Sequence, residues 1–271
     1  MPIRITAGAT NVTASGNQLI MQLPTSWEPP HGTLVAVDQL SIYYSWRNIT
    51  AAKNNNTFTY RVNGSTFLVV MPDGYYAFSD LNAYLQQVMF TNGHYLLDNA
   101  GTPQYYLSWV VNPTYYALSL TATIIPSSLP SGWANPASLT LSGTCPQVIV
   151  PSTNFATYTG FVAGTYPATN ATTQVVTGGV PAVVDITGVN VCANFAQDNR
   201  GLSSNAQNIA YFSPTEGAAV YGGQITYRPQ NLQWVSAAGS YNQLIITFYD
   251  QLYRALPILD YTGLTISLRT P

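Results

Sequence analysis

The segment NQLIITFYDQLYRALPILDYTGLTISLRT, residues 242–270, contains two β-strand patterns. In its last part, TGLTISLRT (262–270), apolar and polar residues alternate, which gives a strand one apolar and one polar face. Its first part, NQLIITFYD (242–250), is apolar nearly throughout, as expected of a central strand that is covered on both faces. The two patterns are too close for a helix between them, so they predict a central strand followed by a terminal strand of a β-rich fold.

Two charged residues lie between these strands, in a chain in which only 7% of the residues are charged. Asp250 and Arg254 are predicted to form an ion pair, which would either fix the turn between two strands or make a contact across a subunit boundary. The alternative is two independent exposed charges.

The same spacing recurs along the chain. FTYRVNGSTFLVV (58–70) predicts a hairpin, because Asn63-Gly64 suits a type I′ turn with positive φ at both central residues. A second pair of strands surrounds Asn112-Pro113, where the proline removes a donor and implies a looser turn. Further strand candidates are NQLIMQL (17–23), TLVAVDQLSIYYSW (33–46), QVIV (147–150), TQVV (173–176) and NLQWVSAA (231–238).

At least eight short strands without intervening helices favour an all-β sandwich or barrel over a parallel α/β architecture. Residues 126–188 are richer in Pro, Ser, Gly, Thr and Ala. We expect them to form long loops and short strands of the same domain, so that residues 1–271 make a single domain.

One segment, PDGYYAFSDLNAYLQQVM (72–89), has helical spacing. Ser79 is expected to be the N-cap with Asp80 in the first turn, and Asn92-Gly93 to end the helix. The helix is expected to lie across an open end or edge of the sandwich and to seal it. Its apolar face would consist of Leu81, Tyr84, Leu85, Val88 and Met89.

Composition excludes several functions. The net charge is −2 with no basic run, so there is little basis for binding nucleic acid. No apolar run is long enough for a membrane span. The N-terminal MPIRITAGAT has no apolar signal-peptide core, so we expect synthesis in the cytosol. The 20 tyrosines and the many amide and hydroxyl side chains must cover the surface instead of charges, and such a surface suits an assembly.

Signatures of enzymes are sparse. His31 and His94 lie in separate predicted loops, belong to no metal-binding pattern and are expected to be exposed. A glycosidase pair could be drawn from Glu28, Glu216 and the aspartates, but nothing in the sequence fixes two of them at the required separation. We therefore expect no catalytic, metal or cofactor site.

Cys145 and Cys192 match no zinc pattern and are too few for a disulfide framework, so they are expected to be free structural thiols. The Asn-x-Ser/Thr sequons are expected to be unused. They lie at Asn11, Asn48, Asn55, Asn63 and Asn170.

Two further stretches could bind ligands. In AQDNRGLSSNAQN (196–208) the oxygen atoms of Asp198, Asn199, Ser203 and Asn205 could bind calcium, but their spacing does not match an EF-hand and an ordinary polar loop is favoured. The aromatic residues of SIYYSWRNIT (41–50) could stack on sugars. Alternation places Ile42, Tyr44 and Trp46 on one face, which favours core or subunit packing.

The order of several segments resembles the penton, or minor capsid, proteins of virophages and polinton-like viruses. The resemblance covers about residues 36–271, and it lies in order and spacing, because each motif is short. The segments are SIYYSWRNIT (41–50), FTYRVNG (58–64), MPDGYYAFSDLNAYLQQVM (71–89), FATYTGFVAGTYP (155–167), DITGVNVCANF (185–195) and the block from Tyr227 to Thr270.

The resemblance implies a single jelly roll of two four-stranded antiparallel sheets. It further implies a homopentamer that closes each fivefold vertex of an icosahedral double-stranded DNA virus capsid, with double-jelly-roll major capsid proteins, and possibly other minor capsid proteins, as partners in the virion. The sequence has no RGD tripeptide, so integrin attachment is not implied. The alternative function is a receptor- or glycan-binding β-sandwich, such as a spike head or a lectin-like module.

Overall fold

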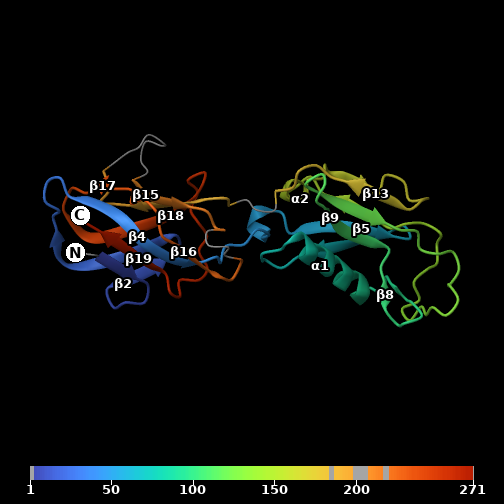
Figure 1. The fold of residues 1–271 in the computed structure, drawn as a ribbon. Helices are drawn as coiled ribbons and strands as arrows, with labels where there is room; N and C mark the ends of the chain where they lie inside the picture. Colours follow the sequence, from blue (N-terminus) through green and yellow to red (C-terminus); the bar gives the residue numbers. More distant parts are fainter. Residues whose placement is uncertain (1–2, 183–185, 198–206, 216–219, 271) are drawn as a thin grey trace. The chain divides into compact units, whose positions relative to one another are not determined.

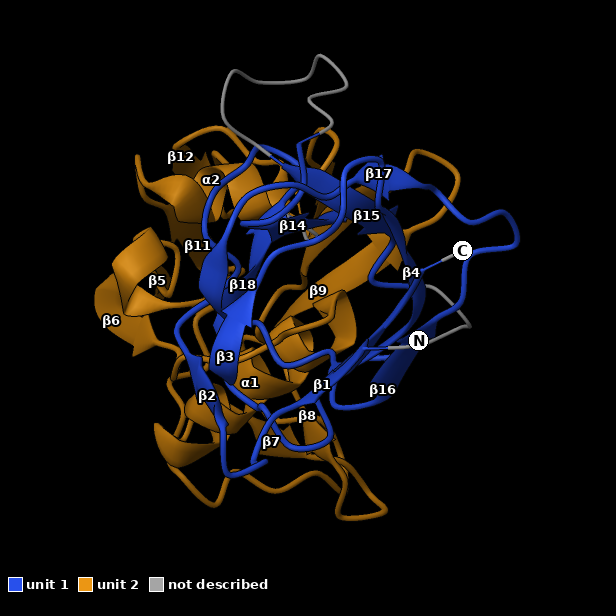
Figure 2. Ribbon diagram, turned by 90° about the vertical axis from the view of Figure 1, so that its left-hand side faces the viewer, with its two compact units in different colours: residues 1–46, 186–271 blue, residues 47–185 orange. Residues whose placement is uncertain are grey.

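The structure is a computed structural model, and it describes residues 3–182, 186–197, 207–215 and 220–270 (Figure 1). The chain divides into two compact units, which Figure 2 distinguishes by colour. Unit 1 comprises residues 1–46 and 186–271, and unit 2 comprises residues 47–185. Unit 2 is therefore an insertion into the sequence of unit 1.

The regular secondary structure of both units is mainly antiparallel strands, which confirms the predicted all-β class with a short helix. In the described residues the strands form five sheets, whereas two sheets of four strands were expected. The two large sheets both belong to unit 1. A single jelly-roll domain over residues 1–271 therefore stays a prediction.

Unit 1 contains two sheets of five strands each, named sheet A and sheet B here. The main path of sheet A runs β1 (Ile3–Thr6), β19 (Thr265–Arg269), β4 (Leu34–Tyr43) and β16 (Gln224–Tyr227), and β17 (Val235–Ser236) also pairs with β4. Sheet B runs β15 (Asn208–Phe212), β14 (Val189–Ala193), β18 (Tyr241–Asp250), β3 (Gln18–Trp27) and β2 (Val12–Ser15).

The two C-terminal strand patterns are confirmed, but the strands belong to different sheets. β18 lies inside sheet B between β14 and β3, as its nearly continuous apolar sequence predicted. β19 lies in sheet A, where Ile266 and Leu268 are buried and Arg269 is exposed. Its alternation therefore separates the core of unit 1 from solvent.

Unit 2 contains three sheets and most of the helical residues. The first sheet consists of β13 (Gln174–Thr177), β10 (Ala117–Ala122) and β9 (Leu107–Asn112), in that order. The second consists of β12 (Gly164–Tyr166), β11 (Gln147–Val150), β5 (Thr57–Val62) and β6 (Ser65–Val70). The third is the pair β7 (Leu96–Leu97) and β8 (Pro103–Gln104). The helices are α1 (Phe78–Thr91), α2 (Asn154–Thr159) and a 3-10 turn, Ala51–Lys53.

Both predicted hairpins form. Asn63 and Gly64 have φ values of 51° and 82°, so the turn between β5 and β6 has positive φ at both central residues, as predicted. The connection between β9 and β10 is longer and places Tyr116 at a φ of 47°. Pro113 thus accompanies the looser turn that the sequence predicted.

The predicted helix forms, but its N-cap was assigned wrongly. α1 begins at Phe78 with Ala77 as the N-cap, and the Asp80 carboxylate accepts a 2.8 Å hydrogen bond from the Ala77 N–H. Asp80 thus reaches back to the cap backbone, and Ser79 lies inside the first turn. At the other end Asn92 is the C-cap, as expected.

α1 packs on the core of unit 2. Leu81, Leu85 and Met89 are fully buried, while Tyr84 and Val88 are partly buried against the same core. The helix also lies beside β9, an edge strand. There Asn82 Oδ1 accepts a 2.9 Å hydrogen bond from the Trp109 N–H, so the helix supplies a partner that the sheet does not.

Candidate functional site

The residues from which an enzyme site could be built are dispersed. His31 lies in an exposed turn, and Glu28 is exposed, where its carboxylate accepts a 3.0 Å hydrogen bond from Ser240 Oγ. Glu216 lies outside the described residues. Within the described part of the chain, no three His, Cys, Asp or Glu side chains gather as a metal site would need.

The four residues considered for calcium, Asp198, Asn199, Ser203 and Asn205, lie outside the described residues. The aromatic face of residues 42–46 is buried. Tyr44 and Trp46 lie with ring centroids 4.7 Å apart, so their faces are not offered to a sugar. Core packing, one of the two uses predicted for them, is confirmed.

Both cysteines are free and buried, as expected. Burial raises the pKa of the Cys192 thiol to about 11, and it also raises that of Cys145. Both thiols therefore stay protonated and unreactive at neutral pH. Two of the sequons are also unsuitable for modification in the folded chain, because Asn48 and Asn55 are buried and the Asn55 amide donates to the Asn48 carbonyl.

His94 lies in a loop, as predicted, but it is half-buried and hydrogen-bonded instead of exposed. His94 follows α1 directly, and its Nδ1 lies 2.8 Å from the hydroxyl of Tyr60 on β5. Asn92 donates a 2.8 Å hydrogen bond to the same hydroxyl. The Tyr60 hydroxyl can therefore donate to a neutral His94 that carries its proton on Nε2. The ring also contacts Phe67 edge-on, with centroids 4.4 Å apart.

This network predicts a dependence of stability on pH. Burial lowers the pKa of His94 below its ordinary value of 6.5. Because the unfolded chain then takes up a proton at a higher pH than the folded chain, unit 2 loses stability as the pH falls below 6.5 towards the folded pKa. An NMR titration of the His94 ring should give a midpoint below 6.5.

His94→Gln is the matched variant, since the amide can still accept from Tyr60 but does not titrate. Denaturant unfolding at neutral and at mildly acidic pH should show a smaller loss of stability for this variant than for the natural chain. An equal loss in both chains, or a ring that titrates at 6.5 or above, would contradict the assignment.

The predicted ion pair between Asp250 and Arg254 is present and fixes the turn after β18. Asp250 is buried, whereas the Arg254 side chain is 58% exposed, and Arg254 Nε lies 2.6 Å from Asp250 Oδ2. Oδ1 accepts from the backbone N–H of Leu252 at 2.8 Å and of Arg254 at 2.9 Å. The carboxylate therefore organises the turn mainly through the backbone.

A number of large apolar side chains are exposed on the described surface. On unit 2 they include Leu68 on β6, Val110 on β9 and Val175 on β13. At the turn between β9 and β10, Tyr115 and Tyr116 are 71% and 74% exposed. Exposed apolar and aromatic side chains on a chain with few charges are typical of a surface that contacts other proteins.

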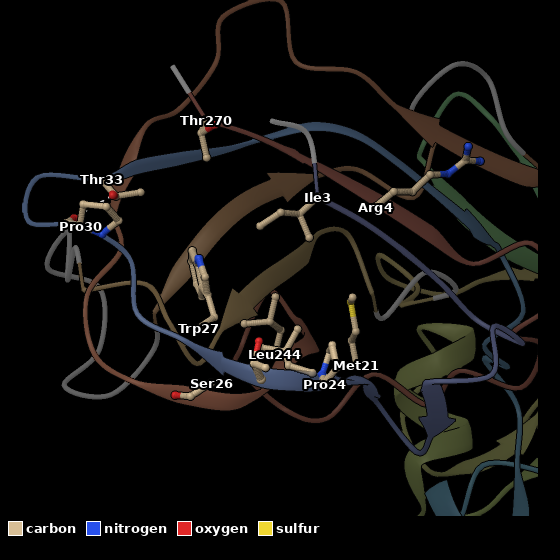
Figure 3. A pocket seen from close by; sticks show the side chains of 12 residues that line it. Ile3, Arg4, Met21, Pro24, Ser26, Trp27, Pro30, Thr33, Leu244 and Thr270 are labelled. Carbon is tan, nitrogen blue, oxygen red and sulfur yellow. Dashed lines mark hydrogen bonds between the residues drawn. The ribbon is translucent and has the colours of Figure 1, made fainter.

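A cavity of about 640 Å³ lies between the two sheets of unit 1 (Figure 3). Ile3 of β1 lies on one side of it, and Met21, Trp27 and Leu244 of sheet B lie on the other. Its volume is in the range of ligand sites, and its lining is mostly apolar. Arg4 is the one charged residue among those that line it.

No helix in the described part of the chain is long and apolar enough to cross a membrane. The sequence matches no family model and no curated protein. Among solved structures, the chain is similar to the crystal structure of the selenomethionine-labelled mavirus penton protein. The match covers 100% of this chain and 99% of that chain, with 10% sequence identity and a TM-score of 0.47.

Proposed function

We propose that the protein is a structural capsid protein that forms homopentamers and closes the fivefold vertices of an icosahedral virus capsid. The observation that carries this proposal is the composition of the exposed surface. Exposed apolar and aromatic side chains recur on a chain with 7% charged residues, as expected of a subunit whose surfaces are covered by neighbours. The ordered segments that resemble virophage pentons support the vertex over other capsid positions.

The proposal assigns a geometric role and no chemical reaction. A ring with fivefold symmetry buries one side of each subunit against the opposite side of the next. Such a ring covers strand edges that are exposed in a single subunit, which stabilises each fold against unwanted pairing. Major capsid proteins of double-jelly-roll architecture would surround the ring, and the protein would be located in the virion.

Electron microscopy of the purified full chain should show rings of five subunits, alone or after mixing with the major capsid protein. We expect the rings to persist in about 1 M salt, where charge interactions are screened within about 3 Å, because few charges are available to hold them. A species that stays monomeric at high micromolar concentration and does not enter particles would contradict the proposal.

A second candidate function is a receptor- or glycan-binding head, which the exposed pair Tyr115 and Tyr116 favours. Exposed tyrosines at a turn can stack on a sugar or anchor a protein contact. This function predicts trimers instead of pentamers, and a loss of binding to a glycan array when both tyrosines are replaced by serine. Pentameric rings that are unchanged by this double replacement would favour the vertex.

A further inference from the structure

The outer edge of sheet A in unit 1 is formed by β1, which pairs only with β19. The Ala7 N–H donates to the Leu264 carbonyl at 2.9 Å, and the register continues as Ile5 opposite Ile266 and Ile3 opposite Leu268. Because hydrogen-bonded pairs alternate along an antiparallel ladder, the backbone groups of Arg4 and Thr6 point away from β19. The Thr6 carbonyl accepts a 3.2 Å hydrogen bond from the Ala9 N–H, so the edge of β1 presents the N–H and carbonyl of Arg4 and the N–H of Thr6 to another strand.

The cavity in unit 1 lies beside this edge, because Ile3 and Arg4 of β1 are among the residues that line it (Figure 3). Along β3 the inward side chains change from Leu19, which is fully buried, to Met21 and Leu23, which are partly exposed and line the cavity. The inner face of sheet B is therefore incompletely covered next to β1.

The facing part of β3 is less suited to pairing. Leu23–Ser26 has no partner in the register with β18 or with β2. Pro24 lies within it and has no N–H, and a proline in an edge segment opposes the addition of a strand. The segments β1 and Leu23–Ser26 both border the cavity. The described residues of β1 include no proline, so β1 is better suited to strand addition.

We propose that β1 accepts an extended segment of another protein chain, which adds to sheet A as an antiparallel strand. Its inward side chains are apolar and occupy the cavity against Met21, Trp27 and Leu244. Its outward side chains are polar, with an acidic residue opposite Arg4. The Arg4 side chain lies on the outer face, has Ser267 as its cross-strand neighbour on β19, and makes no ion pair with any described residue.

The proposal goes beyond the vertex assignment, because it concerns one edge of unit 1 and does not depend on a fivefold ring. It also differs from a binding site for a hydrocarbon chain, which would fill the same apolar cavity without using the backbone of β1. The two ligands can therefore be distinguished by their effect on the amides of Arg4 and Thr6.

The test uses the full chain labelled with 15N and a blocked peptide, acetyl-Thr-Val-Glu-Val-Thr-Val-Thr-amide. Titration should shift the amide signals of Arg4 and Thr6 together with those of the cavity lining. In an antiparallel pair with Glu opposite Arg4, the Glu N–H donates to the Arg4 carbonyl, so N-methylation of Glu should weaken binding on the order of tenfold. N-methylation of the valine that follows Glu is the matched control and should have a smaller effect, because the N–H of that valine points away from β1.

Two protein variants complete the test. Arg4→Pro removes the outward N–H without removing a hydrogen bond to β19, and Arg4→Thr removes the charge but keeps the N–H. Peptide binding should be weaker by about fivefold in the proline variant than in the threonine variant. Equal binding by the two variants would overturn the proposal. It would also be overturned by equal effects of the two N-methylated peptides on the unmodified chain, or by laurate binding that shifts the lining residues when the peptide does not.

Discussion

Replacing Phe58 by alanine is expected to lower the free energy of unfolding of unit 2 by about 3–5 kcal/mol. Phe58 is 1% exposed, stacks on Phe155 with ring centroids 4.8 Å apart and contacts Trp109 edge-on at 6.5 Å. The truncation removes these contacts and leaves a cavity that the rigid strands around it can fill only in part.

Hydrogen exchange resolved by residue is the appropriate measurement, since a chain of two compact units need not unfold in one transition. Protection should fall throughout β5, β9 and α2. Leu68→Ala is the control, because Leu68 lies on the neighbouring β6 and is 66% exposed, so its truncation should change stability by less than about 0.5 kcal/mol. Similar losses for the two variants would contradict the packing described for Phe58.

Replacing Asp250 by alanine is expected to destabilise unit 1 by about 2–4 kcal/mol, because the backbone N–H groups of Leu252 and Arg254 then lose their acceptor. The lost ion pair contributes less, since the exposed Arg254 side chain can be solvated by water. Denaturant unfolding followed by the exchange of β14 and β18 amides would measure the loss.

Two further substitutions separate the contributions at this turn. Arg254→Ala removes the guanidinium but not the carboxylate, and it should cost at most about 1 kcal/mol. Asp250→Asn keeps an oxygen acceptor for the backbone and should give an intermediate loss. If Arg254→Ala were as damaging as Asp250→Ala, the side-chain pair and not the backbone would be the source of stability.

Short sequence patterns correctly predicted those elements whose structure depends only on residues close together in the chain. Asn63-Gly64 gives a two-residue turn because both residues tolerate positive φ, and the turn sets the register of β5 and β6. Asp250 and Arg254 are four residues apart, so their pairing needs only the turn between them. The alternation in β19 follows from burial on one face.

Features that depend on contacts between distant parts of the chain could not be predicted from local sequence patterns. His94 was expected to be exposed because its partner Tyr60 is 34 positions earlier in the chain. The N-cap of α1 was misassigned because Ala77 has no capping side chain and is recognised as the cap only through the hydrogen bond from its N–H to the Asp80 carboxylate.

The division into two units was also hidden from the sequence. Trp46 and Arg47, where unit 1 gives way to unit 2, lie within a continuous run of β-rich sequence, and the strands on either side have the same spacing and composition. Periodicity reports which face of a strand is buried, but it does not report which core the face belongs to. The cavity beside β1 likewise is lined by residues of β1, β3 and β18, which lie far apart in the sequence, so no single segment encodes it.

The pairing of β1 with β19 has a consequence for the order in which the chain folds. Ile3 is paired with Leu268, so sheet A cannot be completed until Leu268 has left the ribosome, whereas residues 47–185 form a contiguous unit that is available much earlier. Closing so long a loop carries a large entropic cost and slows folding. During synthesis the N-terminal strands of unit 1 therefore lack their C-terminal partner strands while unit 2, which is inserted in the sequence of unit 1, folds around its own core.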